Sequence, residues 1–170
     1  SGALDEAVLD QAVERILGIV LRYRDAQVPQ AVFDREADHR TAVELEKECA
    51  VLLKNDGTLP LRRGAKLAYL GGFAAKPRYQ GGGSSHINAA RVSSALECAP
   101  DGVVYEEAFP ADRDEIDEAA FARAVQAAQE AEAAVIFAGL PDSFESEGYD
   151  RTHMRLPDCQ NELIRRVLAV

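Results

Sequence analysis

The stretch that decides the fold reads Ala-Ala-Val-Ile-Phe-Ala-Gly-Leu over residues 133–140, and Phe-Glu-Ser-Glu-Gly-Tyr-Asp-Arg follows over residues 144–151. The first part has the length and the residue types of a buried strand. In open α/β sheets, ligands bind at the carboxyl ends of the strands. Two glutamates and an aspartate on such a strand-end loop therefore indicate a candidate acid/base site. A solvated loop whose Arg151 neutralises its own carboxylates is the plainer interpretation, and this segment taken alone favours it.

The segments on either side alternate between helices and strands, which indicates an α/β fold with a mainly parallel sheet. Asp117 is a good cap for a helix that begins at Glu118, and Pro157 suits the first turn of a final helix. The expected helices span residues 3–23, 40–54, 118–131 and 158–168, and the expected strands span 66–70, 103–106 and 133–140. The chain stops after three strands, so we expect a partial α/β sandwich that is truncated at its carboxyl end.

Three regions of different composition indicate the domain organisation. Residues 1–24 carry apolar side chains at helical spacing, over a face so broad that the helix needs a partner to pack against. Residues 25–39 are polar and have no clear period, which is typical of a linker. Residues 40–170 hold the remaining helices and strands. The Ser-Gly start resembles a tag scar or a cut, so we expect the native amino terminus to lie upstream.

Composition argues against several classes of function. The chain has 170 residues, of which 47% are hydrophobic, yet no apolar run reaches the roughly 18 residues of a membrane helix. Its net charge of −10 argues against nucleic acid and against an anionic membrane surface, whereas a neutral ligand such as a sugar meets no electrostatic conflict. The three cysteines and three histidines are scattered without metal-ligand spacing, so we expect neither a metal nor a cofactor.

A second candidate segment is the glycine-rich loop Gln-Gly-Gly-Gly-Ser-Ser at residues 80–85. It lacks the GxGxxG spacing of a dinucleotide loop and the GK[ST] ending of a P-loop, so the sequence does not favour a nucleotide site. A flexible turn and a loop that lines a sugar site are both open at this point. His86 follows the loop, where it is either a plain loop residue or a hydrogen-bond donor to a sugar hydroxyl.

Three segments together resemble one family. Residues 51–61 read Val-Leu-Leu-Lys-Asn-Asp-Gly-Thr-Leu-Pro-Leu, and residues 79–85 read Tyr-Gln-Gly-Gly-Gly-Ser-Ser. Residues 145–151 read Glu-Ser-Glu-Gly-Tyr-Asp-Arg, followed by Leu156-Pro157 and Gln160. In order and spacing these segments resemble the carboxyl-terminal α/β sandwich domain of glycoside hydrolase family 3, which includes β-glucosidases. The first helix looks like the last helix of that family's preceding barrel domain, so the resemblance extends over essentially the whole chain.

The resemblance implies a retaining exo-β-glycosidase, most simply a β-glucosidase, that hydrolyses terminal β-linked glycosyl residues. In this family a barrel domain carries the aspartate nucleophile, in a motif that does not occur in this chain, and the sandwich domain carries the acid/base glutamate. That glutamate corresponds to Glu145, with Glu147 as the fallback. The glycine-rich loop would face the mouth of the active site. The substrate-binding residues implied in this way are Gly82, Gly83, Ser84 and Phe144.

Other functions fit the same fold. A non-catalytic carbohydrate-binding or structural domain is the alternative, and a flavodoxin-like domain for a small anion is disfavoured because the acidic loop would repel phosphate. We expect Asp150 and Arg151 to form an ion pair that shapes the loop. The expected partners are a β-glycoside and the barrel domain, and we expect the isolated chain to be inactive. Missing strands would leave an open sheet edge, so we also expect a homo-oligomer.

Overall fold

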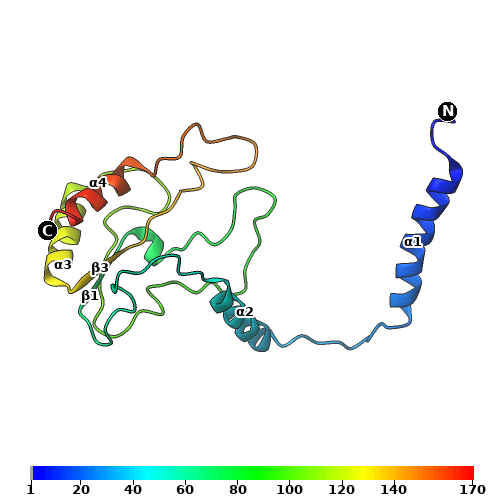
Figure 1. Cartoon of the computed structure of the whole chain (residues 1–170), viewed down its shortest axis with the longest axis horizontal. Helices are drawn as coiled ribbons and strands as arrows, with labels where there is room; N and C mark the ends of the chain where they lie inside the picture. Colours follow the sequence, from blue (N-terminus) through cyan, green and yellow to red (C-terminus); the bar gives the residue numbers. More distant parts are fainter. Residues whose placement is uncertain (1) are drawn as a thin grey trace. The chain divides into compact units, whose positions relative to one another are not determined.

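The computed structural model describes residues 2–170, and the chain divides into two compact units between Asn55 and Asp56. The first unit contains two helices, α1 (Glu6–Arg24) and α2 (Arg35–Cys49), shown in blue and cyan in Figure 1. The second unit contains the sheet, two further helices and the loops that carry the candidate site.

Helix α1 confirms the first predicted helix, with a start at Glu6 rather than at residue 3. The Asp5 carboxylate caps it by accepting a hydrogen bond from a backbone N–H of the first turn. Val8, Ile16 and Val20 on its apolar face are 57%, 63% and 55% exposed. The face that the sequence predicts to need a partner is therefore open to solvent in the described chain. No described helix is long and apolar enough to cross a membrane.

The bounds of α2 differ from the sequence prediction. The helix was expected over residues 40–54, but it begins at Arg35 and ends at Cys49. It begins early because the Asp34 carboxylate accepts hydrogen bonds from two backbone N–H groups of the first turn. Such a cap satisfies donors that have no partner inside the helix. The capping carboxylate, and not the apolar pattern on which the prediction rested, fixes the start of this helix.

The second unit is built on a parallel sheet with the spatial order β2 (Val104–Glu106), β1 (Leu67–Leu70) and β3 (Ala133–Ile136). In the register, Tyr69 of the central strand lies opposite Tyr105 of β2. Parallel strands end at the same edge of a sheet, so the loops that follow β1 and β3 leave from one edge. The predicted α/β fold with a mainly parallel sheet is confirmed.

Strand β3 ends earlier than the sequence predicts. It was expected over residues 133–140, but it ends at Ile136. Its neighbour β1 turns away at Gly71, whose φ of +105° is a conformation that glycine adopts without strain. Phe137 still donates one backbone hydrogen bond to the Leu70 carbonyl oxygen, and beyond it β1 offers no strand partner. The apolar run therefore continues past the strand into the loop.

Helices α3 (Glu118–Glu130) and α4 (Asp158–Val167) form one side of the second unit, next to the sheet (Figure 1). The Asp117 carboxylate caps α3, as predicted, and α3 packs on β1, β2 and α4. Small side chains let α3 lie close to the strands. The buried alanines of α3 are Ala120, Ala124 and Ala127. The largest apolar side chains with no exposed area are Leu70, Phe109, Phe121 and Leu163. Burying each such side chain contributes about 1.5–3 kcal/mol.

Helix α4 is capped from a distant part of the chain. Pro157 at its N-cap position has no side-chain hydrogen bond, and the Asp114 carboxylate accepts bonds from the N–H groups of Asp158 and Cys159 at 2.9 Å and 2.8 Å. Burial raises the pKa of Asp114, but these backbone hydrogen bonds outweigh it and leave the pKa below its ordinary value. The negative charge thus stays at the positive end of the helix dipole.

The first turn of α4 also fixes the loop that follows β3. Gln160 is 1% exposed, and its side-chain oxygen accepts a hydrogen bond from the Gly139 N–H at 3.0 Å. Its amide nitrogen donates to the Gly139 carbonyl oxygen at 2.7 Å. Both backbone groups of one glycine are therefore paired with one buried side chain. This pair sets the starting point of the acidic loop relative to the helical side of the unit.

Candidate functional site

The candidate site consists of two loops at the carboxyl edge of the sheet. The first follows β1 and contains the 3₁₀ turn Gly72–Ala74 and the glycine-rich residues 80–85. The second follows β3 and carries Glu145 and Glu147. In Figure 1 the two loops, in green and orange, extend in the same direction from the sheet. Two sets of polar contacts, one from Arg78 and one from the glycine-rich loop, join them.

Arg78 of the first loop contacts both ends of a short segment of the second. Its Nη1 donates to the Leu140 carbonyl oxygen at 3.1 Å, and its Nη2 donates to the Glu145 carbonyl oxygen at 3.0 Å. Nη1 also lies 3.3 Å from Glu145 Oε2. The buried Nε lies 3.0 Å from Asp142 Oδ1 in an ion pair that lacks the alignment of a hydrogen bond. The Arg78 guanidinium therefore contacts two backbone carbonyls and two carboxylates.

Glu147 is held by Ser84 of the glycine-rich loop. The Ser84 backbone N–H donates to Glu147 Oε2 at 2.9 Å, and the Ser84 hydroxyl lies 2.9 Å from each carboxylate oxygen. The backbone hydrogen bond, followed by the hydroxyl hydrogen bond, lowers the pKa of Glu147 below its ordinary value. The structure therefore favours Glu147 as an anion that ties the two loops together. We call this pair the Ser84–Glu147 clasp.

Glycines are required where the loops approach each other. A Cβ built on Gly82 would lie 2.7 Å from Ser146 Oγ, and one built on Gly83 would lie 2.6 Å from Glu147 Oε2. Gly83 also has a φ of +88°, which residues with a side chain rarely adopt. The Gly-Gly pair therefore permits the close approach that forms the clasp. The sequence alone left a flexible turn open as an alternative, and the observed packing is a tight contact.

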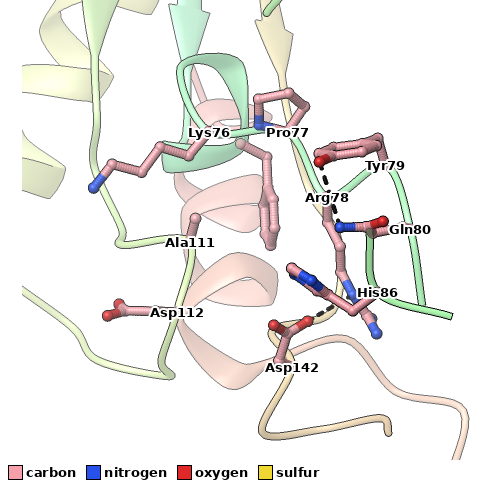
Figure 2. Close-up of a pocket in the computed structure, with 10 residues that line it drawn as sticks. Lys76, Pro77, Arg78, Tyr79, Gln80, His86, Ala111, Asp112 and Asp142 are labelled. Carbon is pink, nitrogen blue, oxygen red and sulfur yellow. Dashed lines mark hydrogen bonds and ion pairs between the residues drawn. The ribbon is translucent and has the colours of Figure 1, made fainter. Parts of the chain in front are cut away.

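A cleft of about 220 Å³ opens beside the Arg78 side chain. Figure 2 shows Arg78, His86 and Asp142 together on one wall, and Asp112 on the opposite wall. The exposed Tyr79 ring also lines this cleft, next to the glycine-rich loop. Cationic, acidic and aromatic groups thus surround one opening at the carboxyl edge of the sheet, which is the usual ligand position in open α/β folds.

Glu145 lines two further clefts. One of about 410 Å³ includes Leu140 and Glu145, and another of about 640 Å³ includes Glu145, Tyr149 and His153. The Glu145 side chain is 54% exposed, although it contacts Arg78. Glu145 is therefore accessible to a molecule that approaches the loop edge, whereas both oxygens of Glu147 are engaged by Ser84.

The implied substrate-binding residues differ in whether they contact the acidic loop or line a cleft. Gly82, Gly83 and Ser84 meet the acidic loop directly. Phe144 is half-buried in a turn in which its N–H donates to the Pro141 carbonyl oxygen, and it lines none of the clefts described above. A role of Phe144 in substrate binding stays a prediction.

The predicted ion pair between Asp150 and Arg151 is wrong. Among residues 2–170 no ion pair joins these two side chains, and Arg151 Nη2 lies 3.5 Å from Met154 Sδ. The positive charge beside the loop comes from Arg78, which precedes Glu145 by 67 residues. Sequence analysis missed this role, although Arg78 stands directly before the quoted glycine-rich segment. Spacing along the chain does not show which cation a fold brings to a given carboxylate.

Other reactive groups in the described residues offer no second centre. Among residues 2–170, no group of three His, Cys, Asp or Glu side chains is arranged to hold a metal ion. Burial, followed by the neighbouring Asp114, raises the pKa of the Cys159 thiol to about 12. That thiol stays protonated near neutral pH and packs as part of the core.

Comparison with known proteins settles the family. Residues 50–170 match the family model described as the glycosyl hydrolase family 3 C-terminal domain. The chain belongs to this family. The match covers the whole second unit, including both loops of the candidate site and the strands from which they emerge.

Individual relatives agree with the family. The chain is 45% identical over 177 residues to thermostable beta-glucosidase B of Acetivibrio thermocellus, a match over 100% of this chain and 23% of that protein. It is 34% identical over 182 residues to an exo-alpha-(1->6)-L-arabinopyranosidase of Bifidobacterium longum, over 99% of this chain and 24% of that protein. A crystal structure of a GH3 beta-glucosidase of Bifidobacterium adolescentis superposes with a TM-score of 0.86 at 36% identity, over 99% of this chain and 26% of that one. The chain thus spans about a quarter of the length of these relatives.

Proposed function

We propose that this domain supplies the general acid/base, Glu145, of a retaining exo-β-glycosidase, with β-glucosidase as the favoured activity. An aspartate of a barrel domain outside this chain would be the nucleophile. Family membership and the accessible Glu145 on the loop after β3 support this proposal. Retaining glycosidases need two carboxyl groups roughly 5–5.5 Å apart, so the barrel would have to approach the loop edge closely.

The state of Glu147 is the observation that carries the assignment to Glu145. A general acid must hold a proton until the departing oxygen takes it. The two hydrogen bonds from Ser84 lower the pKa of Glu147 and so stabilise its anion, which opposes that role. Glu145 has no bond from Ser84: among residues 2–170 its carboxylate contacts only Arg78 Nη1, at 3.3 Å, and its side chain is half exposed. We therefore assign the acid/base role to Glu145 and a loop-holding role to Glu147.

In the proposed reaction Glu145 acts twice. As an acid it protonates the departing glycosidic oxygen while the barrel aspartate attacks the anomeric carbon and forms a glycosyl-enzyme. As a base it then removes a proton from the water that hydrolyses this intermediate, which returns Glu145 to its protonated form. Such proton transfer contributes about 10²–10⁴-fold to the rate. The rest of the acceleration would come from the nucleophile and from contacts with the sugar.

The clasped glycine-rich loop is proposed as the rim of the site for the departing group. Gly82, Gly83 and Ser84 adjoin the acidic loop, and the Tyr79 ring lines the cleft next to them. Phe144 remains a proposed contact that would require this turn to open. The acidic net charge of −10 fits a neutral sugar better than a phosphorylated one. Of the two activities for which these relatives are named, beta-glucosidase and L-arabinopyranosidase, we propose the first for this protein.

The test replaces Glu145 with alanine in the polypeptide that also carries the barrel. For the Glu145→Ala variant we expect kcat/KM for cellobiose to fall about 10²–10⁴-fold, because its departing group needs a proton. With dinitrophenyl β-glucoside the loss should be far smaller. Added azide should restore turnover of this substrate and give a β-glycosyl azide, because azide needs no general base.

Glu147→Gln is the matched control, because it changes a carboxylate two residues away. It should give no azide product, and because it weakens only the Ser84–Glu147 clasp, any selective loss on substrates with poor departing groups should be far smaller than that of Glu145→Ala. If Glu147→Gln shows both signs and Glu145→Ala shows neither, the acid/base is Glu147. If neither variant shows them while sugar binding falls, the domain is a carbohydrate-binding module. The chain alone should not hydrolyse aryl β-glucosides, and measurable hydrolysis by the chain alone would contradict a nucleophile outside it.

A further inference from the structure

Arg78 is the one cation that contacts the acidic loop at several points in the described residues. Its side chain is 19% exposed, whereas those of Asp142 and Glu145 are 74% and 54% exposed. The largely buried Arg78 side chain thus lies beside two more exposed carboxylates. Taking a charged group out of water is costly unless it is paired, so the carbonyls and carboxylates that Arg78 contacts define where the loop can lie.

The pattern of donors shows that Arg78 holds the backbone of the loop. The Leu140 carbonyl lies at the end of the apolar run and the Glu145 carbonyl lies at the proposed acid/base residue, and the guanidinium binds both. The segment between them is closed into a compact turn by these two bonds. The contact to the Glu145 carboxylate is the longest of the three hydrogen bonds, at 3.3 Å. The two shorter bonds indicate that Arg78 holds the backbone carbonyls more closely than it holds the carboxyl group.

We propose that Arg78 is the positioning residue of the acid/base loop, which it holds through the carbonyls of Leu140 and Glu145. This inference rests on the proposed role of Glu145. The Ser84–Glu147 clasp holds the loop on the far side of Glu145, so the proposed acid/base residue lies between two fixed points. Both fixed points come from the loop after β1, which thereby acts as the template for the loop after β3.

An arginine suits this role for a geometric reason. Its planar fork presents five N–H donors in fixed directions, whereas a lysine ammonium is a single point on a flexible stem. A lysine at position 78 could contact one carbonyl or one carboxylate but could not bridge Leu140 to Glu145 in the same way. Arg78→Lys therefore keeps the charge and removes the bridge. Arg78→Met removes both and keeps an unbranched stem beside Phe73 and Pro77, which share the hollow with it.

Misplacement of a general acid has a recognisable kinetic signature. The rate then depends more steeply on how readily the departing group leaves, because a good departing group needs no proton. Phenyl and dinitrophenyl β-glucosides differ in this property and carry no departing sugar. They therefore separate a positioning role from a direct contact between Arg78 and the departing sugar, which would affect cellobiose alone.

The experiment compares kcat/KM for both aryl glucosides and cellobiose in the polypeptide that carries the barrel. For Arg78→Met we expect a loss of about 10²-fold on phenyl β-glucoside, the usual result of a small misplacement, and a much smaller loss on dinitrophenyl β-glucoside. Arg78→Lys should show the same selectivity with a smaller loss. Asp142→Asn, which frees one contact of Arg78 without emptying the site, should show it more weakly still. Arg165→Met, which breaks an exposed ion pair on α4, should show none.

The outcomes separate this inference from the proposed function. Glu145→Ala in the same assay defines the selectivity that loss of the acid produces. If Glu145→Ala shows it and Arg78→Met lowers both aryl substrates equally, or cellobiose alone, the positioning role is wrong while the acid/base role stands. If Glu145→Ala shows no selectivity, the proposed function fails and takes this inference with it. If Arg78→Met does not fold, as seen by circular dichroism, the Arg78→Lys and Asp142→Asn variants decide the question by the same comparison.

Discussion

Two sides of the second unit are held together in different ways. On the helix-covered side, α3 and α4 bury Phe121, Ala124 and Leu163 completely. At the loop edge, residues 71–86 and 139–154 meet through Arg78 and the Ser84–Glu147 clasp, with largely exposed carboxylates. Apolar burial dominates folding energetics, whereas exposed ion pairs contribute only about 0–1 kcal/mol. Stability therefore comes mainly from apolar burial, whereas the polar contacts of the loop edge serve chiefly to define geometry.

The two sides are joined at the start of α4. Asp114 caps the helix, and Gln160 of its first turn binds both backbone groups of Gly139. The acidic loop thus starts at a glycine that the buried Gln160 side chain holds, and the contacts further along the loop are exposed. A domain that presents a proton donor to another domain benefits from this arrangement, because the loop is placed by the core yet remains accessible.

The largest loss of stability is expected when Phe121 is replaced. This ring has no exposed area, and the Arg166 guanidinium lies 5.1 Å from its centroid. Phe121→Ala should lower the free energy of unfolding by about 3–5 kcal/mol, the usual loss for a buried phenylalanine. Urea denaturation followed by circular dichroism measures this change. Phe33→Ala makes the same substitution at a side chain that is 71% exposed and should alter stability by less than about 0.5 kcal/mol. Equal losses at both positions would contradict the packing described here.

The next largest effect is expected in the glycine-rich loop, where a substitution should lower activity more than stability. Gly83→Ala places a Cβ against Glu147 at a φ of +88°, so the clasp must open or the backbone must bear a strain of about 1–3 kcal/mol. In the polypeptide that carries the barrel we expect kcat/KM for phenyl β-glucoside to fall about 10-fold or more through displacement of the loop. Unfolding should shift much less than in Phe121→Ala.

Gly81→Ala is the matched control for that variant. Its Cβ would lie 3.3 Å from Ser85 Oγ, a contact that a small movement of the hydroxyl relieves, and its φ is not in the left-handed region. Activity and stability should both stay close to those of the unchanged protein. A loss at Gly81 as large as the loss at Gly83 would show that any added methyl group disturbs the loop, and the clasp would then not be the reason for the glycines.

Sequence reasoning succeeded where a structure depends on neighbouring residues. Asp117 predicts the start of α3, because a cap and its helix are adjacent in the chain. The apolar runs at 66–70 and 133–140 predict strands, because the residue types that favour a strand lie within the run itself. The position of a candidate site also followed, since loops after parallel strands meet at one edge. The bounds of α2 were missed because the prediction rested on an apolar pattern and did not include Asp34 as a cap, and residues 50–54 do not continue the helix.

What the sequence could not show are the contacts between distant segments. Asp114 caps a helix that begins 44 residues later, and Arg78 binds a carboxylate 67 residues later. Neither pairing has a spacing rule, because each depends on how the sheet brings loops together. The expected Asp150–Arg151 pair failed for the same reason, since adjacency in the chain does not orient two side chains toward each other. The proposed division of roles between Glu145 and Glu147 likewise depends on Ser84, which only the folded chain brings near Glu147.

The smallest predicted effect is a difference in how the two sides of the second unit respond to a fall in pH. The pKa of Glu147 is lowered by its bonds from Ser84, and the pKa of Asp114 is lowered by the backbone bonds that outweigh its burial. A carboxylate whose folded pKa is depressed contributes stability that is present above its ordinary pKa and is lost as pH falls through the folded value. The ordinary values are 4.5 for Glu147 and 3.8 for Asp114. Both contacts should therefore persist at neutral pH and weaken only below these values.

The two losses should have different consequences, which amide NMR combined with thermal denaturation can separate. The Ser84 amide reports protonation of Glu147, and the Cys159 amide reports protonation of Asp114, because each N–H donates to that carboxylate. Protonation of Asp114 removes the cap of α4, so the change at Cys159 should accompany a fall in the melting temperature. The change at Ser84 should open the clasp with little effect on melting, and Ser84→Ala should likewise melt near the unchanged protein at neutral pH. Ser84→Ala and a variant that lacks the Asp114 carboxylate could instead lower the melting temperature by the same amount. The loop edge would then support the fold as strongly as the helix cap does, and the division between the two sides would be wrong.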